Sequence, residues 1–546
     1  MEEAGTQSYA QPVKQEARTR ALKHAVNLLT KYRQKAAIAP PNYVRAIRAH
    51  CAKLKYYPEY PEAAKSCRDE DVESWEKFRK SVVGLLKPED LTIAYLAGPE
   101  PTNDINTLLK LGVRAENIWA FEVSSKSFES AIKDVKNKEI RGIKLIKMKM
   151  EDYFASTPRR FDIIYFDACA TFPSNDQKTL KIVSSIFRNS SLSSIGVLIT
   201  NFSAPDLSND TDLECYSHLI AANLYSKGTL DRRKGRQIYT GESAEAHGFY
   251  LSKEVMPPEP GEKNKYFFDE VKKNFEFYYG SFITRHIMDV AAIIAPTERL
   301  ASGKLWSSLF IDQKDVIRKS KKWLAPASEE NHDYSSDYIF EGGNFSLVKA
   351  LAYLAIEDPG LEYPENVKKF ILRWIRQLEG NEDQHKSIGN ILSFYGCKDS
   401  TEYWTESMLD MKSFNYRDKM PQLCDVATEE LTFYPLFAQY SYPAHCNVNQ
   451  ARRFTYIAEG KKNRMFLDVL PFDECRYVYD WLSSAHLVAG DLEKMSTQLT
   501  FRFALDAIVK NIHSYSDDFL YGAHAVGLCD EFDSGQLKAR INLTNK

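Results

Sequence analysis

One stretch, from Leu91 to Glu122, constrains the fold of this 546-residue chain more than any other. Residues 91–97 form a short apolar run rich in strand-forming side chains, and a turn follows at Gly98–Pro101. Apolar positions recur at helical spacing over 102–112, and residues 117–122 form a second apolar strand that ends on an acid. A strand, a loop, a helix and a second strand in this order predict half of a doubly wound α/β domain.

The loop and the acid of this unit predict a ligand site. In open α/β sheets, ligands bind in the crevice outside the carboxyl ends of the strands, so Gly98 and Glu122 are expected to lie side by side. A carboxylate in that place can accept hydrogen bonds from both hydroxyls of a ribose. The loop lacks the G-x-G-x-x-G pattern of dinucleotide sites, and Pro99 and Pro101 have no amide donor for a phosphate. These features favour a ligand without phosphates, such as S-adenosylmethionine.

Strands and helices continue to alternate after this unit. Strands are predicted at 143–150, 161–169 and 195–200, with amphipathic helical segments between them. The acidic pair Glu151-Asp152 follows the first of these strands, and Asp167 lies near the end of the second. Together with the two earlier strands, they predict a doubly wound, mostly parallel α/β sheet.

The first loop, the acids after the second and third strands, and the fourth strand resemble the core of class I S-adenosylmethionine-dependent methyltransferases, a Rossmann-like fold. The resemblance covers residues 91–202 and implies S-adenosyl-L-methionine as the cofactor. It also implies that Asp167 lies at the reaction end of the fourth strand, as a catalytic base or a substrate anchor. The cofactor-binding residues that it implies are Gly98 and Glu100 beside the methionine moiety, Glu122 on the ribose, and Glu151 and Asp152 near the adenine.

The chain departs from that family in two places. Its first loop lacks the usual acid and glycines, and Glu100 either holds the ammonium of the ligand or is a solvated loop acid. Its fourth strand ends on Asp167-Ala168-Cys169 without the prolines that accompany base-modifying motifs. Cys169 is therefore either a nucleophile with Asp167 as its base or a buried, inert thiol.

Composition sets wider limits. The net charge of -2 and the pI near 6.6 give no nucleic-acid signature for the whole chain, so any basic surface has to be local. The nine cysteines show no paired spacing, and we expect reduced thiols in a cytoplasmic protein. The apolar stretches are too short to span a membrane, and no spacing of His and Cys predicts a metal site.

Three basic clusters predict a nucleic-acid surface. Residues 1–60 contain 11 Lys and Arg against four Glu, although a solvated helix face is the alternative interpretation. The other two clusters are a basic loop at 231–236 and a predicted β-hairpin near 453–470. The residues predicted to contact DNA or RNA are Arg232, Arg233, Lys234, Arg236, Arg452, Arg453, Lys461 and Lys462.

The chain divides into three predicted regions. Residues 1–88 form a basic N-terminal helical segment, and 89–256 form the methyltransferase-like domain. The Pro-rich stretch at 257–261 predicts a linker to 262–546, a mainly α-helical C-terminal region that includes the hairpin.

Two functions follow from this organisation. The first is an S-adenosylmethionine-dependent methyltransferase that acts on a macromolecule, with nucleic acid preferred, and the acids Glu122 and Asp167 favour it. The second is a catalytically inactive protein of the same fold that binds a protein partner through its helical C-terminal region. The divergent first loop favours the second. We lean towards the enzyme.

Overall fold

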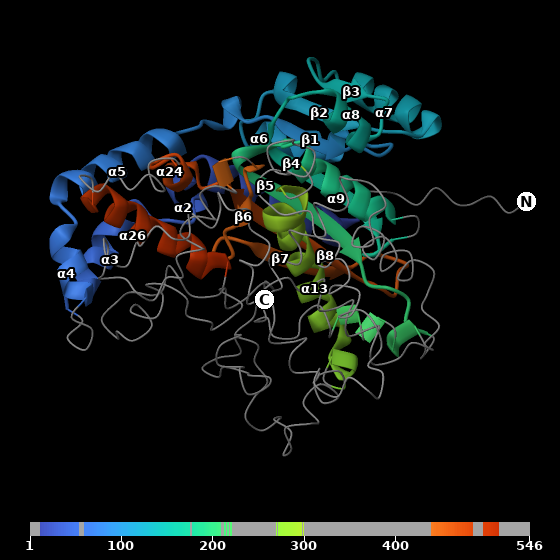
Figure 1. Ribbon diagram of the computed structural model, residues 1–546. Coiled ribbons are helices and arrows are strands. Elements are labelled where there is room, and N and C mark those ends of the chain that lie inside the picture. The colour runs from blue at the N-terminus through green and yellow to red at the C-terminus, as the bar shows by residue number, and fades with distance from the viewer. Residues whose placement is uncertain are drawn as a thin grey trace, which may run out of the picture.

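The computed structural model describes residues 11–53, 59–174, 177–208, 212–214, 216–217, 219–220, 269, 271–296, 299, 438–439, 441–483 and 495–512 (Figure 1). They form one mixed α/β sheet with helices on both faces. None of the helices in this part of the chain has the length and apolar character of a membrane span. The basic loop at 231–236, the stretch at 257–261 and most of the C-terminal region lie outside the described residues.

The sheet has eight strands in the order β3-β2-β1-β4-β5-β8-β6, and β7 also pairs with β8. Strands β1 to β5 are parallel, whereas β8 runs antiparallel to β5, β6 and β7. The strand order reverses between β1 and β4, which is where doubly wound sheets bind their ligands. The strands are β1 Ile93–Leu96, β2 Ile118–Phe121, β3 Lys144–Ile146, β4 Phe161–Ala170, β5 Leu192–Ser203, β6 His445–Cys446, β7 Arg452–Ile457 and β8 Arg464–Asp473.

The strands predicted at 91–97, 117–122, 161–169 and 195–200 are confirmed as β1, β2, β4 and β5. Strands β1 and β2 are almost wholly buried because helices cover both faces of the sheet, and their sequences are therefore continuously apolar. The strand predicted at 143–150 is only three residues long, since Met150 already begins helix α8 (Met150–Ser156).

One face of the sheet is covered by α8, α9 (Lys178–Arg188) and α13 (Phe275–Asp289). Alternate residues of the strands point into this layer, among them Trp119, Phe166 and Leu198. Helix α9 contributes one apolar face to the same core, which includes Leu180 and Val183. The helices and the strands thus bury their apolar sides against each other.

The other face is covered by helices from both ends of the chain. Helix α1 packs against β5, β7, β8 and α6, so the N-terminal helical segment is part of the folded core. Helix α26 packs against α3, α4, α5 and β6. The helices of this layer are α1 Pro12–Leu29, α2 Arg33–Ala36, α3 Tyr43–Cys51, α4 Glu59–Ser66, α5 Asp69–Val83, α6 Thr102–Lys110, α24 Arg476–Tyr479 and α26 Met495–Ile512.

The hairpin predicted near 453–470 is confirmed as β7 and β8, with Arg453 opposite Asp468. The sequence places it in the C-terminal region, but β8 also pairs with β5 from Ile195 opposite Asp473 to Ser203 opposite Met465. The hairpin therefore completes the same sheet as β1 to β5. Pairing between segments so far apart leaves no local sequence pattern. The boundaries of the three predicted regions stay a prediction.

Candidate functional site

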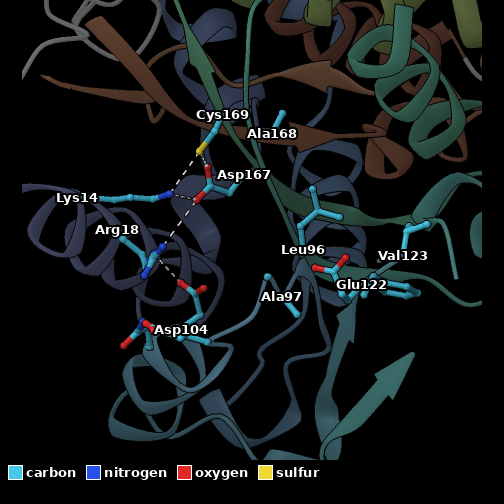
Figure 2. Close-up of a pocket in the computed structure, with 14 residues that line it drawn as sticks. Lys14, Arg18, Leu96, Ala97, Asp104, Glu122, Val123, Asp167, Ala168 and Cys169 are labelled. Carbon is cyan, nitrogen blue, oxygen red and sulfur yellow. Dashed lines mark hydrogen bonds and ion pairs between the residues drawn. The ribbon is translucent and has the colours of Figure 1, made fainter. Parts of the chain in front are cut away.

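A pocket of about 260 Å³ lies at the carboxyl ends of β1, β2 and β4 (Figure 2). Its lining comes from α1, from the loop between β1 and α6, and from the ends of β2 and β4. The volume is slightly below the roughly 300–1,000 Å³ that is usual for small-molecule sites, which suits one small ligand. Of the predicted site residues, the pocket brings together Gly98, Glu100, Glu122 and Asp167.

Gly98 shapes the side of the pocket next to β1. Its φ of 62° lies in the left-handed region, which glycine adopts without strain. A Cβ atom here would meet no heavy atom within 4 Å, so the main chain faces open space. The Ala97 N–H donates to the Phe121 carbonyl at 2.9 Å, which holds this loop beside the end of β2. A ligand can therefore approach the backbone at Gly98 closely.

Glu122 lies directly after β2, on the side of the pocket opposite Lys14 and Asp167 (Figure 2). Its Oε1 accepts the Ser124 N–H at 2.8 Å, which fixes the carboxylate near the start of α7 (Ser125–Asn137). Ser124 caps that helix, because its Oγ accepts the Ser127 N–H. Within the described residues Glu122 forms no ion pair.

Two cations from α1 line the pocket and pair with acids on the side away from Glu122 (Figure 2). Lys14 Nζ lies 3.1 Å from Asp167 Oδ2, and Arg18 Nη2 lies 3.7 Å from the same oxygen. Arg18 Nε also lies 2.8 Å from Asp104 Oδ1 on α6. Sequence reasoning missed these cations, because their only local signal was a basic helix with several equivalent lysines and arginines.

Asp167 is buried within this cluster. Its Oδ1 accepts hydrogen bonds from Asn201 Nδ2 at 2.8 Å and from the Cys169 thiol at 2.9 Å. Burial acts to raise the pKa of Asp167, but the Lys14 ammonium and the Arg18 guanidinium outweigh it and hold this pKa below its ordinary value. A carboxylate stabilised in this way is a weak general base, because it binds a proton poorly near neutral pH.

Cys169 donates to Asp167 and accepts from Lys14 Nζ at 3.3 Å. Desolvation and the negative charge of Asp167 raise the pKa of this thiol to about 12. The thiolate is the nucleophilic form of cysteine, and at neutral pH Cys169 stays protonated. The structure thus favours an unreactive thiol over the nucleophile, but Cys169 is exposed, so the prediction of a buried thiol is wrong.

The buried carboxyl of Asp104 should make the free energy of unfolding depend on pH. Burial raises its pKa to about 6, against the opposing effect of Arg18. Between about pH 4 and pH 6 the folded chain then binds more protons at this group than the unfolded chain, so its contribution to the free energy of unfolding falls as the pH rises. Urea titrations give the free energy of unfolding of wild type and of Asp104→Asn at each pH. We expect the difference, wild type minus variant, to fall by on the order of 2 kcal/mol between about pH 4 and pH 6. A rise would show that Arg18 keeps the carboxyl ionised.

Glu151 and Asp152 lie in the first turn of α8 and do not line the pocket. Asp152 is exposed, and the Glu151 carbonyl accepts the Ser185 hydroxyl from α9. The pocket therefore does not bring these two acids together with Glu122. Their predicted place near an adenine stays a prediction. Among the described residues, no group of three or more His, Cys, Asp or Glu side chains is arranged to hold a metal ion.

The residues predicted to contact nucleic acid differ in their exposure in the structure. Arg453 is buried, and its Nε and Nη2 lie 2.6 Å from the two oxygens of Asp468, which contradicts a role at a nucleic-acid surface. Arg452 is half-buried and donates to the carbonyls of Asn449 and Ala451. Lys461 and Lys462 are exposed near the hairpin turn, and Arg232, Arg233, Lys234 and Arg236 lie outside the described residues.

No model of a protein family and no curated protein matches the chain. Part of it resembles solved structures. One is an S-adenosylmethionine-dependent methyltransferase from Clostridium acetobutylicum ATCC 824, 17% identical over 30% of this chain and 58% of that chain, with a TM-score of 0.18. Another is an rRNA methylase from Streptococcus thermophilus, 20% identical over 23% of this chain and 68% of that chain, with a TM-score of 0.17. PKMT2 from Rickettsia typhi, in complex with AdoHcy, is 12% identical over 47% of this chain and 48% of that chain, with a TM-score of 0.21.

At TM-scores this low, the similarities assign neither a family nor an activity to the chain. Its fold is established by its own strand order, a mixed and mostly parallel α/β sheet. The solved structures that resemble part of this chain include S-adenosylmethionine-dependent methyltransferases.

Proposed function

We propose that the pocket binds S-adenosylmethionine and that the chain transfers its methyl group to a macromolecule, with nucleic acid preferred. The observation that carries the proposal is the position of Gly98 and Glu122 side by side at the switch point of the sheet. Glu122 would accept the ribose hydroxyls, and the open backbone at Gly98 would face the methionine moiety. When bound, S-adenosylmethionine supplies a methyl group that is carried on a sulfonium. A nucleophile of the acceptor attacks the carbon of this methyl group.

The charges of the pocket support a cationic ligand. Lys14 and Arg18 face Asp167 and Asp104, which leaves Glu100 and Glu122 without an ion-pair partner in the part of the chain that the structure describes. The Glu100 carboxylate accepts the Asn103 side-chain amide at 3.2 Å. S-adenosylmethionine carries an ammonium, a sulfonium and one carboxylate, so its net charge is positive. The Glu100 carboxylate would hold the ammonium, and Glu122 would add negative charge to the pocket while it accepts the ribose hydroxyls.

The state of Asp167 favours a second function. With its pKa lowered by two cations, Asp167 is not poised to remove a proton from an acceptor. A protein that binds the cofactor and has lost catalysis, and that acts through a protein partner, fits this observation. Incubation with labelled S-adenosylmethionine and pools of DNA, RNA and protein separates the two functions, because only the enzyme transfers label.

Calorimetric titration of the full chain with S-adenosylmethionine tests the proposal. We expect saturable heat with this ligand and none with ATP, because Pro99 and Pro101 withhold amide donors from phosphates. Since ATP shares the adenosine moiety, it is the matched control ligand. Absence of heat and of any thermal shift with millimolar S-adenosylmethionine would overturn the assignment.

A further inference from the structure

The β3 edge of the sheet carries exposed positive charge that no acid in the described part of the chain pairs with. Helix α7, strand β3 and helix α8 lie together at one end of the molecule (Figure 1). Over residues 126–159, eight Lys and Arg side chains are exposed against three exposed acids. We call these eight cations the basic edge; Lys133, Lys136, Lys147, Lys149 and Arg159 belong to it.

The basic edge lacks the ion pairs that several arginines elsewhere in the described fold form. None of them forms an ion pair with any residue that the structure describes. By contrast, the neighbouring Arg160 lies against Glu474, and Arg453 lies against Asp468. Acids among the described residues therefore neutralise these two arginines but not the basic edge.

Two cations of this region lie over the same aromatic ring, that of Trp119. Lys144 Nζ lies 4.0 Å from the centroid of the Trp119 ring, and the Arg159 guanidinium carbon lies 4.5 Å from it. Burial lowers the pKa of Lys144, and the positive charge of Arg159 lowers it further. Like charges held this close repel each other, and an anionic partner would relieve the repulsion.

The basic edge adjoins the candidate pocket. The Glu122 N–H donates to the Ile146 carbonyl at 3.0 Å, so Lys147, the next residue after Ile146, begins beside the pocket rim. Two apolar side chains are exposed at the same end of the strands, Met148 at 42% and Val123 at 53%, and Val123 lines the pocket. Cations interleaved with exposed apolar groups suit a chain of phosphates that carries bases.

We propose that the basic edge binds the phosphate backbone of a nucleic acid and holds it beside the pocket. The role of the bound nucleic acid rests on the proposed function, since the basic edge would place a nucleotide acceptor near Gly98 and Glu122. The basic edge does not need that function for binding itself, because the cations attract phosphates whether or not the pocket is occupied. The basic edge takes the place of Arg452 and Arg453 as the proposed phosphate contacts. Those two arginines donate hydrogen bonds to the Ala451 carbonyl and to Asp468 within the fold.

Fluorescence anisotropy with labelled single-stranded RNA and duplex DNA, without cofactor, tests the inference on the full chain. The test variant is Lys147→Gln with Lys149→Gln, and the matched control is Lys77→Gln with Lys80→Gln, a pair of exposed lysines on α5. Each lost phosphate contact removes about 0.9 from the slope of log affinity against log salt for duplex DNA, and about 0.7 for single-stranded RNA. Between about 50 and 200 mM salt, affinity should thus fall about tenfold less for the test variant than for wild type. The control should follow wild type.

Three outcomes would overturn the inference. The first is salt-independent binding or no binding to either oligonucleotide, and the second is an equal effect of the control pair. The third is binding to phosphatidylserine vesicles in place of oligonucleotides, since it would assign the basic edge to a membrane surface. Calorimetry with S-adenosylmethionine is run on the same samples, so failure of the basic edge is distinguishable from failure of the pocket.

Discussion

Asp167→Asn is expected to lower the free energy of unfolding by about 3–5 kcal/mol. The reason is that Lys14 and Arg18 lie 3.1 Å and 3.7 Å from Asp167 Oδ2, and the amide would leave both with less compensating charge in a buried site. Removal of one partner of a buried ion pair is strongly destabilising because the remaining charge stays desolvated. Urea unfolding at neutral pH, followed by circular dichroism, measures the change.

Two further variants show whether the ion pairs cause this loss. Adding Lys14→Met to Asp167→Asn should recover part of the stability, because it removes the unpaired ammonium. Asp152→Asn replaces an exposed acid and should change the free energy of unfolding by less than about 0.5 kcal/mol. If Asp167→Asn also changed it this little, the cluster would be solvated and Asp167 would return as a candidate base.

Glu122→Ala should weaken S-adenosylmethionine binding by roughly 30- to 1,000-fold, which corresponds to about 2–4 kcal/mol. The carboxylate is an ionised acceptor at the end of β2, held by the Ser124 N–H and without an ion pair among the described residues. Its removal would leave two ribose hydroxyls without their acceptor in the pocket. Calorimetric titration of wild type and variant gives the ratio of dissociation constants.

Control variants separate binding from folding. Glu129→Ala removes an exposed acid of α7 outside the pocket and should bind like wild type. Glu122→Gln keeps the shape of the side chain and should lie between wild type and Glu122→Ala, because it loses charge and keeps an acceptor. Wild-type affinity in Glu122→Ala, with a wild-type melting temperature, would remove the ribose role from Glu122.

Much of the fold was predictable because its cause is local. The runs at 91–97 and 117–122 are continuously apolar, since both faces of β1 and β2 are covered, and such runs stand out in a sequence. Strand β3 was overestimated, because its alternating lysines continue past Ile146 while the backbone already turns into α8. The pairing of β8 with β5 was not predictable, because it joins segments from distant parts of the chain.

The candidate site divides in the same way. Gly98 and Glu122 were placed together by sequence reasoning, since parallel strands bring their carboxyl ends to one edge and no tertiary detail is needed. Lys14 and Arg18 were not placed there, because a basic helix does not show which of its cations will meet a distant acid. Because Lys14 and Arg18 lie beside Asp167, we expect Asp167 to act as an ion-pair partner and not as a base.

The sequence by itself determined a parallel α/β sheet with an acid at the end of its second strand, because hydrophobic periodicity and turn residues act over short distances. Only the tertiary structure decided which charges are buried and which stay free. Arg453 and Lys147 both carry a positive charge at neutral pH, yet one lies against Asp468 in the core and the other lies exposed beside the pocket. Burial and pairing depend on residues brought together from distant segments, and these alone decide whether a cation supports the fold or is left to bind a partner.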